Sequence, residues 1–258
     1  MKRVIINADD FGMTRGCTEG IIKAMMEGIV TSTSVMINMD GALQSITFAK
    51  ENGIEAIGLH LTLTAGKPVT ETEKIGSLVQ ENSRFHKRSK ALLSKIKLEE
   101  VRIELEKQIE VFLKTGMGLT HLDSHHHIHM YDGVREVVGG LAKKYGVPLR
   151  HPDHRTKKYL LNNNIVTTDY FSMDFYGEGA NLENLIRIIE EFPRGTIEIM
   201  THPAFLDDEL MKMSNYNNDR ERELEILTGN EIKKWLESSG VRLISFKELR
   251  DENEILSS

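Results

Sequence analysis

Strand-like and helix-like segments alternate along almost the whole chain, and this alternation restricts the fold more than any other feature. Runs rich in β-branched residues occur at 3–10, 30–38 and 54–64, and segments with apolar residues at helical spacing lie between them at 17–28 and 41–53. Parallel strands need long crossover connections, which helices usually supply. We therefore expect an α/β fold with a parallel sheet.

The same pattern continues to the end of the chain and gives about eight strand candidates. Further strands are expected at 119–125, 147–151, 166–171, 195–202 and 241–246, and further helices at 98–116, 132–145, 181–192 and 230–239. No linker or internal repeat divides the 258 residues, so we expect one domain, 1–258. The segment 66–97 interrupts the pattern with Gly, Pro, Ser, Thr and Lys and is expected to be a lid-like insertion on the substrate side.

Charge and hydropathy exclude two classes of partner. The net charge is −6 and no stripe of Lys and Arg is interleaved with aromatic residues, so we expect no nucleic-acid partner. No apolar stretch reaches 18 residues, and the N-terminal apolar run stops at two aspartates, so we expect neither a membrane span nor a secretion signal. The single cysteine, Cys17, cannot form a disulfide within the chain. The expected compartment is the cytoplasm.

Reactive side chains occur in or at the ends of four expected strands. Asp9 and Asp10 end the first, His60 lies in the third, a run of histidines follows the fourth, and His202 ends a later one. Working residues gather at the carboxyl ends of strands in parallel α/β folds, so these side chains could share one rim. Each also has an ordinary alternative: a turn or helix cap for the aspartates, a core position for His60 and a strand cap for His202. The histidines expected on the surface are His86, His151 and His154.

The segment HLDSHHHIHM, at 121–130, holds five of the ten histidines. A helix would align three of them at intervals of four residues, whereas an extended chain points alternate residues to one face. The preceding Gly-Met-Gly favours a strand that enters a loop. We therefore expect an extended segment whose shared face carries His121, Asp123, His125, His127 and His129.

A catalytic divalent metal needs about three protein ligands and one open position for water or substrate. Asp10, His60 and His125 would supply one carboxylate and two imidazoles, a set that suits Zn²⁺ or another transition metal at least as well as Mg²⁺. Asp9 would then be free to act as the general base. A regular strand points Asp9 and Asp10 to opposite faces, so both can serve only if the chain turns there, which Gly12 favours.

Six motifs occur in order over nearly the whole chain: NADDFG, GIVTSTSVM, GLHLTLTAGKPV, THLDSHHHIHM, FYGE and MTHPAF. This set resembles the YdjC-like carbohydrate deacetylases, including the chitooligosaccharide deacetylases. The resemblance implies a single-domain, TIM-like β/α barrel, either regular or distorted, that removes N-acetyl groups from N-acetylglucosamine-containing oligosaccharides. It also implies one divalent metal, usually Mg²⁺, with Asp10, His60 and His125 as ligands and Asp9 as the base. A looser analogy with polysaccharide deacetylases makes His202 the proton donor.

Three hypotheses of function remain open on the sequence alone. In the first, a metal activates water, Asp9 takes its proton, and His202 protonates the leaving amine. The second is a metal-dependent sugar isomerase or phosphoesterase on the same barrel, which would need a second metal or a further set of lysines or carboxylates. The third is a non-catalytic metal-binding protein with a closed site. The expected partner is a small oligosaccharide, and a homodimer is left open.

Overall fold

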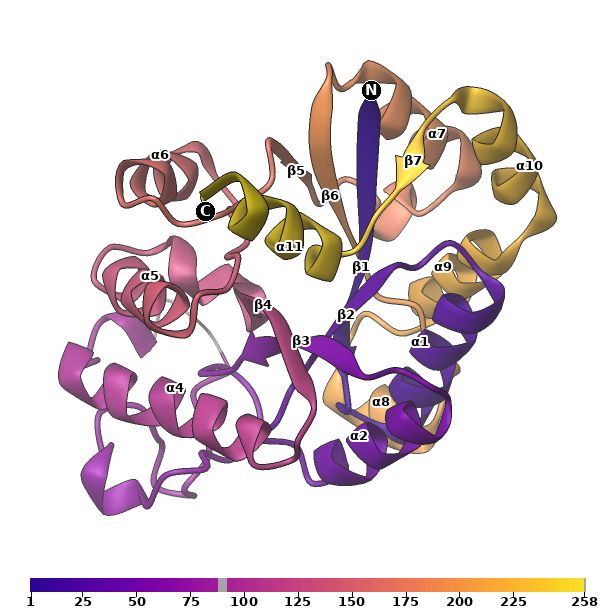
Figure 1. Ribbon diagram of the computed structural model, residues 1–258. Helices are drawn as coiled ribbons and strands as arrows, with labels where there is room; N and C mark the ends of the chain where they lie inside the picture. The colour runs from indigo at the N-terminus through magenta and orange to yellow at the C-terminus, as the bar shows by residue number, and fades with distance from the viewer. Residues whose placement is uncertain (88–91, 258) are drawn as a thin grey trace.

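The computed structural model describes residues 1–87 and 92–257 and shows one sheet with helices packed around it (Figure 1). The strands are β1 (Lys2–Phe11), β2 (Ser32–Val35), β3 (Ala56–Leu61), β4 (Gly118–Ser124), β5 (Tyr170–Ser172), β6 (Gly195–Thr201) and β7 (Arg242–Leu243). The α-helices in the described ranges are α1 (Arg15–Glu27), α2 (Ala42–Glu51), α4 (Leu98–Leu113), α5 (Val134–Tyr145), α6 (His154–Asn162), α7 (Leu182–Glu191), α8 (Asp208–Met213), α9 (Asn218–Thr228), α10 (Asn230–Ser239) and α11 (Phe246–Ser257). Short 3₁₀ helices are η1 (Thr72–Lys74), η2 (His125–Met130) and η3 (Gly177–Gly179).

Every strand pair in the sheet is parallel, which confirms the predicted architecture. The strand order is β4-β3-β2-β1-β6-β5, and β7 pairs with the first half of β1. Beyond β4, Leu122 forms a parallel bridge with Leu149, and the backbone N–H of Leu149 donates to the carbonyl of Val166. Val166 lies four residues before β5, so these contacts extend from β4 to the segment that leads into β5.

The two faces of each strand have different compositions because side chains alternate along a strand. On β1, Val4, Ile6 and Ala8 belong to the main hydrophobic core, whereas Asn7 and Asp9 alternate with them on the opposite face. On β3 and β6 the same alternation separates aliphatic residues in the core from buried polar side chains. The face of the sheet opposite the main hydrophobic core therefore carries buried polar side chains, and this face is called the polar interior below.

The amino ends of the strands are covered by the C-terminal helix α11, drawn in yellow (Figure 1). Phe246 at its start is fully buried and stacks on the ring of His121, with 3.8 Å between the ring centroids. Phe246, Leu249, Ile244 and Ile5 form a small hydrophobic cluster separate from the main core. This cluster closes the sheet interior at one end and leaves the carboxyl ends of the strands as the route for a ligand.

Several local predictions were wrong. The segment 147–151, expected as a strand, contributes only the bridge at Leu149. Helices α6, α8, α9 and α11 were not predicted; α6, α9 and α11 are rich in charged residues, and α8 is only six residues long. No helix in the two described ranges combines the length and apolar character that a membrane span requires.

Candidate active site

A cavity of about 1110 Å³ opens at the carboxyl ends of the strands. All five predicted site residues line it, although they come from four separate parts of the chain: Asp9, Asp10, His60, His125 and His202. The two aspartates lie near the end of β1, His60 is in β3, and the other two histidines directly follow β4 and β6. The sheet topology therefore brings them together as the strand-end argument predicted.

The chain turns where the two aspartates occur, which allows both carboxylates to face the cavity. Asp10 has a φ of 68° and Gly12 a φ of 81°. The backbone N–H of Met13 donates to the carbonyl of Asp10 at 3.1 Å and closes the turn. Aspartate tolerates the left-handed region better than most residues, so the strain at Asp10 is modest.

Asp10 has one oxygen held by the protein and one that is open. Its Oδ2 accepts from the Arg220 guanidinium at 2.7 Å. Its buried Oδ1 has no hydrogen-bond partner within the described chain and lies 3.6 Å from His60 Nε2. Burial would raise the pKa of Asp10, but the positive charges of Arg220 and of His125, His202 and His60 together outweigh it and hold the pKa below the ordinary value. A buried, ionised and unsatisfied carboxylate oxygen suits a cation ligand.

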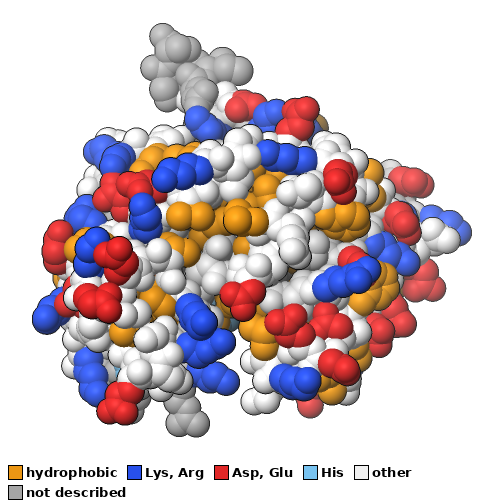
Figure 2. All heavy atoms as spheres, turned by 90° about the horizontal axis from the view of Figure 1, so that it is seen from below, with side chains coloured by type: hydrophobic (Ala, Val, Ile, Leu, Met, Phe, Trp, Pro, Cys, Tyr) orange, Lys and Arg blue, Asp and Glu red, His pale blue; other side chains and the backbone are white. Residues whose placement is uncertain are grey.

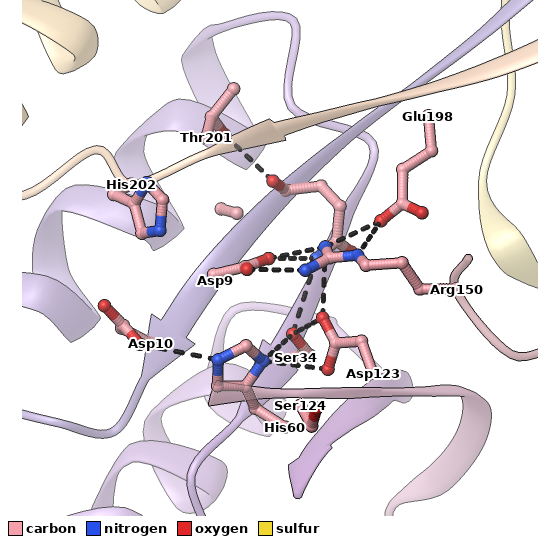
Figure 3. A network of polar contacts seen from close by, with 12 residues as sticks. Asp9, Asp10, Ser34, His60, Asp123, Ser124, Arg150, Glu198, Thr201 and His202 are labelled. Atoms are coloured by element: carbon pink, nitrogen blue, oxygen red, sulfur yellow. Dashed lines mark hydrogen bonds and ion pairs between the residues drawn. The ribbon is translucent and has the colours of Figure 1, made fainter. Parts of the chain in front are cut away.

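The rings of His60 and His125 are each held through Nδ1. His60 Nδ1 lies 2.8 Å from Asp123 Oδ1, and the hydroxyl of Ser34 donates to the other oxygen of Asp123 (Figure 3). His125 Nδ1 lies 2.7 Å from the hydroxyl of Thr64. The ring centroids of the two histidines are 5.9 Å apart. Fixing Nδ1 in this way orients the ring and leaves Nε2 for another partner, as is common for metal-binding histidines.

Arg150 occupies the polar interior directly beneath the cavity (Figure 3). The fully buried guanidinium makes a bidentate pair with Asp9, at 2.6 and 2.7 Å, and also contacts Asp123 at 3.1 Å and Glu198 at 2.6 Å. Burial would raise the pKa of Asp9, but Arg150 outweighs it and holds the pKa well below the ordinary value. In contrast, burial is the main influence on Glu198 and raises its pKa to about 7.

A second set of ligand atoms, on Asp9, His60 and Asp123, lies within 4.8 Å of one another and could also hold a metal. However, Arg150 pairs with both carboxylates, and His60 Nδ1 already contacts Asp123. A cation in this position would be repelled by the buried guanidinium. Asp10, His60 and His125 are not among the groups of described residues whose ligand atoms all lie within 4.8 Å of one another, so they would have to move closer together to share one ion. Within the described chain, Asp10 Oδ1 has no hydrogen-bond partner, because Arg220 contacts Oδ2.

His202 lies in a separate network with Glu223 and two tyrosines. Its backbone N–H and the hydroxyl of Tyr216 both donate to the fully buried Glu223. Tyr216 stacks on Tyr176, with 3.9 Å between ring centroids, and both rings meet His202 edge-on. Burial, aided by Arg220, lowers the pKa of His202 to about 4, so its ring is neutral at pH 7.

The histidine run does not stay extended beyond Ser124, which corrects the prediction of one shared face. A 3₁₀ segment begins at His125, and the next two residues, His126 and His127, have φ values of 55° and 49°. Their side chains line the cavity, whereas His129 is buried and contacts Ser124 and the carbonyl of Arg150. Side chains therefore alternate between two faces only within β4 and not in the residues that follow it.

Two of the three histidines expected on the surface lie elsewhere. His151 is buried, with its ring against the carbonyl of Thr168 at 3.0 Å, and His86 is half-buried and lines the cavity. His154 is exposed, as expected.

The predicted insertion supplies one wall of the cavity through residues 80–87. Arg84 and Lys87 from this segment and Lys212 from α8 lie on the rim, and none of the three makes an ion pair with another described residue. Figure 2 shows Lys and Arg side chains gathered beside a notch at the lower edge of the face seen from below. The mouth of the cavity therefore carries uncompensated positive charge.

The fold and the site define a class: parallel α/β proteins with carboxylate and imidazole side chains converging at the carboxyl ends of the strands. Residues 3–238 match the model of the YdjC-like protein family. The chain belongs to this family. Relatives named carbohydrate deacetylase include a protein of Brevibacillus brevis, 39% identical and covering 96% of this chain and 99% of that protein, and one of Thermoanaerobacter pseudethanolicus, 36% identical and covering 97% and 100%.

Two solved structures are similar to this chain. A protein of Enterococcus faecalis V583, provisionally described as a cellobiose-phosphate cleavage protein, is 38% identical, with a TM-score of 0.91 over 96% of this chain and 98% of that one. A family 4 carbohydrate esterase of Streptomyces lividans in complex with acetate has a TM-score of 0.52 at 12% identity, covering 93% and 90%. The second likeness concerns the fold alone.

Proposed function

We propose that residues 1–258 form one metal-dependent deacetylase domain that hydrolyses the N-acetyl group of N-acetylglucosamine-containing oligosaccharides. The observation that carries the proposal is Asp10 Oδ1, a buried carboxylate oxygen without a hydrogen-bond partner in the described chain, 3.6 Å from His60 Nε2. Curated relatives that cover nearly the whole chain are named carbohydrate deacetylases, which supports the reaction class.

Asp10, His60 and His125 would hold the divalent ion. All three residues line the cavity, and Arg220, Asp123 and Thr64 hold one polar atom of each respectively. A bound divalent ion would lower the pKa of a neighbouring water and polarise the acetyl carbonyl. Two imidazoles and one carboxylate suit a transition metal such as Zn²⁺ by their ligand chemistry, whereas Mg²⁺ prefers an oxygen shell.

Asp9 is the proposed general base. Its Oδ1 accepts from both Asn7 and Arg150. Among the described residues Oδ2 accepts from Arg150 alone, which leaves a lone pair for a proton from water. The pKa of Asp9 is held low, so the carboxylate is ionised at neutral pH, although the same shift makes it a weaker proton acceptor. Arg150 fixes its orientation through two parallel hydrogen bonds.

Attack by the water oxygen on the acetyl carbon and cleavage of the C–N bond give acetate and a free amine. The amine nitrogen must gain a proton as it leaves. His202 lines the cavity and is the proposed donor; its buried Nδ1 has no hydrogen-bond partner in the described structure and lies 3.9 Å from Glu223 Oε1. Since its pKa is lowered to about 4, His202 would donate only after taking up a proton during the reaction.

The rim favours a sugar that carries a negative charge. Arg84, Lys87 and Lys212 are unpaired cations at the mouth within the described structure, and a phosphate on the sugar would neutralise them. The Enterococcus faecalis structure is described in connection with a phosphorylated disaccharide. We therefore include phosphorylated N-acetyl disaccharides among the substrates to be tested.

The decisive experiment measures metal content and acetate release together. The purified protein should hold about one divalent ion per chain and release acetate and free amine in equal amounts from N-acetylglucosamine oligomers. A chelator should stop the reaction, and adding the metal back should restore it. Stoichiometric metal with no acetate release from any of these sugars, phosphorylated or not, would favour a non-catalytic metal-binding protein instead.

A further inference from the structure

Two methionines lie in the deep part of the cavity, beside the proposed catalytic residues. Met13 and Met200 both line the cavity, and each is only 6% exposed. Met13 follows the turn at Asp10, and Met200 lies two residues before His202 on β6. Both methionines therefore line the same cavity as the two aspartates and are close in the chain to a proposed catalytic residue or ligand.

The strand register fixes the position of Met200. β1 and β6 are parallel neighbours in which Asn7 pairs with Met200. In-register side chains of adjacent strands point to the same face, and the side chain of Asn7 is on the polar interior face, where it donates to Asp9. Met200 therefore lies next to Asn7, one interior position above Glu198.

The position of Met13 follows from the turn. The backbone hydrogen bond from Met13 to the carbonyl of Asp10 fixes Met13 at the turn that carries the two aspartates. Thr14 then caps α1 by accepting from the N–H of Cys17, so Met13 is fixed between a closed turn and a helix start.

We propose that Met13 and Met200 form the wall that contacts the methyl group of the substrate's acyl chain and that they limit this chain to acetyl. This inference rests on the proposed deacetylase function. If Asp9 activates the water that attacks the carbonyl carbon, the adjoining methyl group must lie within a few ångströms of Asp9. Apolar atoms are needed there, because a methyl group cannot satisfy buried polar atoms.

The other apolar lining residues are placed less suitably. Met173 and Met213 are 49% and 38% exposed, and belong to the outer part of the cavity. Phe85 is buried, but it comes from the insertion, where its N–H donates to the carbonyl of Gly66. Met13 and Met200 are the buried apolar lining residues that adjoin the catalytic residues in the chain.

The test is a change of acyl preference. Glucosamine oligomers carrying acetyl, propionyl or butyryl groups would be compared by kcat/KM in the parent protein and in Met13→Ala and Met200→Ala. Shortening either side chain makes room for additional carbons, and one methylene in an apolar pocket is worth about 10- to 200-fold in specificity. We expect the butyryl-to-acetyl ratio of kcat/KM to rise at least about tenfold in one or both variants.

Met173→Ala is the matched control, because it shortens a methionine of the same cavity near the mouth. It should change the three substrates in parallel and leave the ratio unaltered. An unaltered ratio in both Met13→Ala and Met200→Ala would overturn the proposal. Should either alanine variant fail to fold, the smaller change to valine would be measured in its place.

A measurement without turnover provides an independent check. In the metal-containing protein labelled with ¹³C at the methionine methyl groups, acetate at a concentration that inhibits turnover should shift the signals of Met13 and Met200 but not that of the exposed Met211. Unchanged Met13 and Met200 signals under these conditions would overturn the proposal. Absence of acetate release by the parent protein would instead contradict the deacetylase function itself.

Discussion

Arg150 makes two adjacent aspartates chemically different. It binds both oxygens of Asp9, whereas Asp10 keeps one oxygen open beside His60. The sequence alone allowed the two roles to be exchanged, because neighbouring residues of the same type carry no local distinction. The distinction comes from a partner 141 residues away in the chain.

At the residue scale, replacing the proposed base and replacing a proposed ligand should have different effects on metal content and turnover. Asp9→Asn cannot accept a proton, so we expect kcat to fall about 10²- to 10⁴-fold while metal content is retained. His125→Ala removes a proposed ligand, so we expect both metal and activity to be lost. The measurements are metal analysis after desalting and acetate release. Near-parental turnover in Asp9→Asn, or full metal content in His125→Ala, would contradict the corresponding role.

The stability contribution of Arg150 can be measured separately from catalysis. Arg150→Met leaves the buried carboxylates of Asp9, Asp123 and Glu198 without their shared counter-charge, so we expect a loss of about 3–5 kcal/mol in the free energy of unfolding. Urea titration measures this loss. The exposed Arg155 provides a control, since Arg155→Met should change stability by less than about 0.5 kcal/mol. Equal effects of the two substitutions would refute the counter-charge interpretation.

At the element scale, two buried residues of α4 hold the chain between β3 and the insertion. Gln108 accepts from the N–H of Thr62 and donates to its carbonyl, and Glu104 accepts from the N–H groups of Val69 and Thr70. Glu104 also accepts from Gln108 at 2.8 Å. Together these hydrogen bonds fix the segment from Thr62 to Thr70. This segment includes Thr64, which contacts His125, and the cavity-lining residues that follow it.

Glu104→Gln should loosen this connection, because a Gln side chain has only one acceptor oxygen for the backbone donors. We expect a loss of about 1–3 kcal/mol. Burial raises the pKa of Glu104 above its ordinary value of 4.5, so the glutamate favours the folded state less as pH rises from 4.5 through the raised pKa. The parent protein should therefore lose stability relative to Glu104→Gln as pH rises. Urea midpoints of the two proteins, measured between pH 4 and pH 8, should become more similar toward pH 8. A constant difference would show that Glu104 does not titrate in this range.

Elements and site residues that follow local rules were predictable, and those that depend on distant partners were not. Asp9, His60 and His202 were found because each lies in or at the end of a strand-like segment. Glu198 lies within the apolar strand GTIEIMT, where an isolated charge could have signalled a buried ion pair. Arg150 had no such signal, since an arginine at the end of a short strand is ordinary on a surface.

At the scale of the whole molecule, several buried histidines make the fold sensitive to acid. Burial lowers the pKa values of His121, His129 and His151 to about 4 each, against an ordinary value of 6.5. As pH falls below 6.5, the unfolded chain binds protons that the native protein does not, so stability is lost progressively between pH 6.5 and about 4. Each histidine can contribute up to roughly 3 kcal/mol to this loss.

The variant His121→Gln tests the contribution of one of these histidines to the loss of stability in acid. Because Gln does not titrate, the dependence of unfolding free energy on pH below 6.5 should be shallower than in the parent by up to about 1.4 kcal/mol per pH unit. Glu198, with its pKa raised to about 7, changes stability in the opposite direction in both proteins and cancels in the comparison. Identical pH slopes for the two proteins would show that His121 is not a source of the acid sensitivity.

The position of β1 at the centre of the sheet also affects how the chain can fold during synthesis. Asp9 is made early, but its partner Arg150 and the neighbouring strand β6 lie beyond the middle of the chain. At typical elongation rates of 5–20 residues per second, roughly 7 to 28 s separate Asp9 from Arg150 on the ribosome. Until Arg150 and β6 have been made, β1 lacks both the cation that compensates the charge of Asp9 and a neighbouring strand, so burial of this carboxylate is unfavourable.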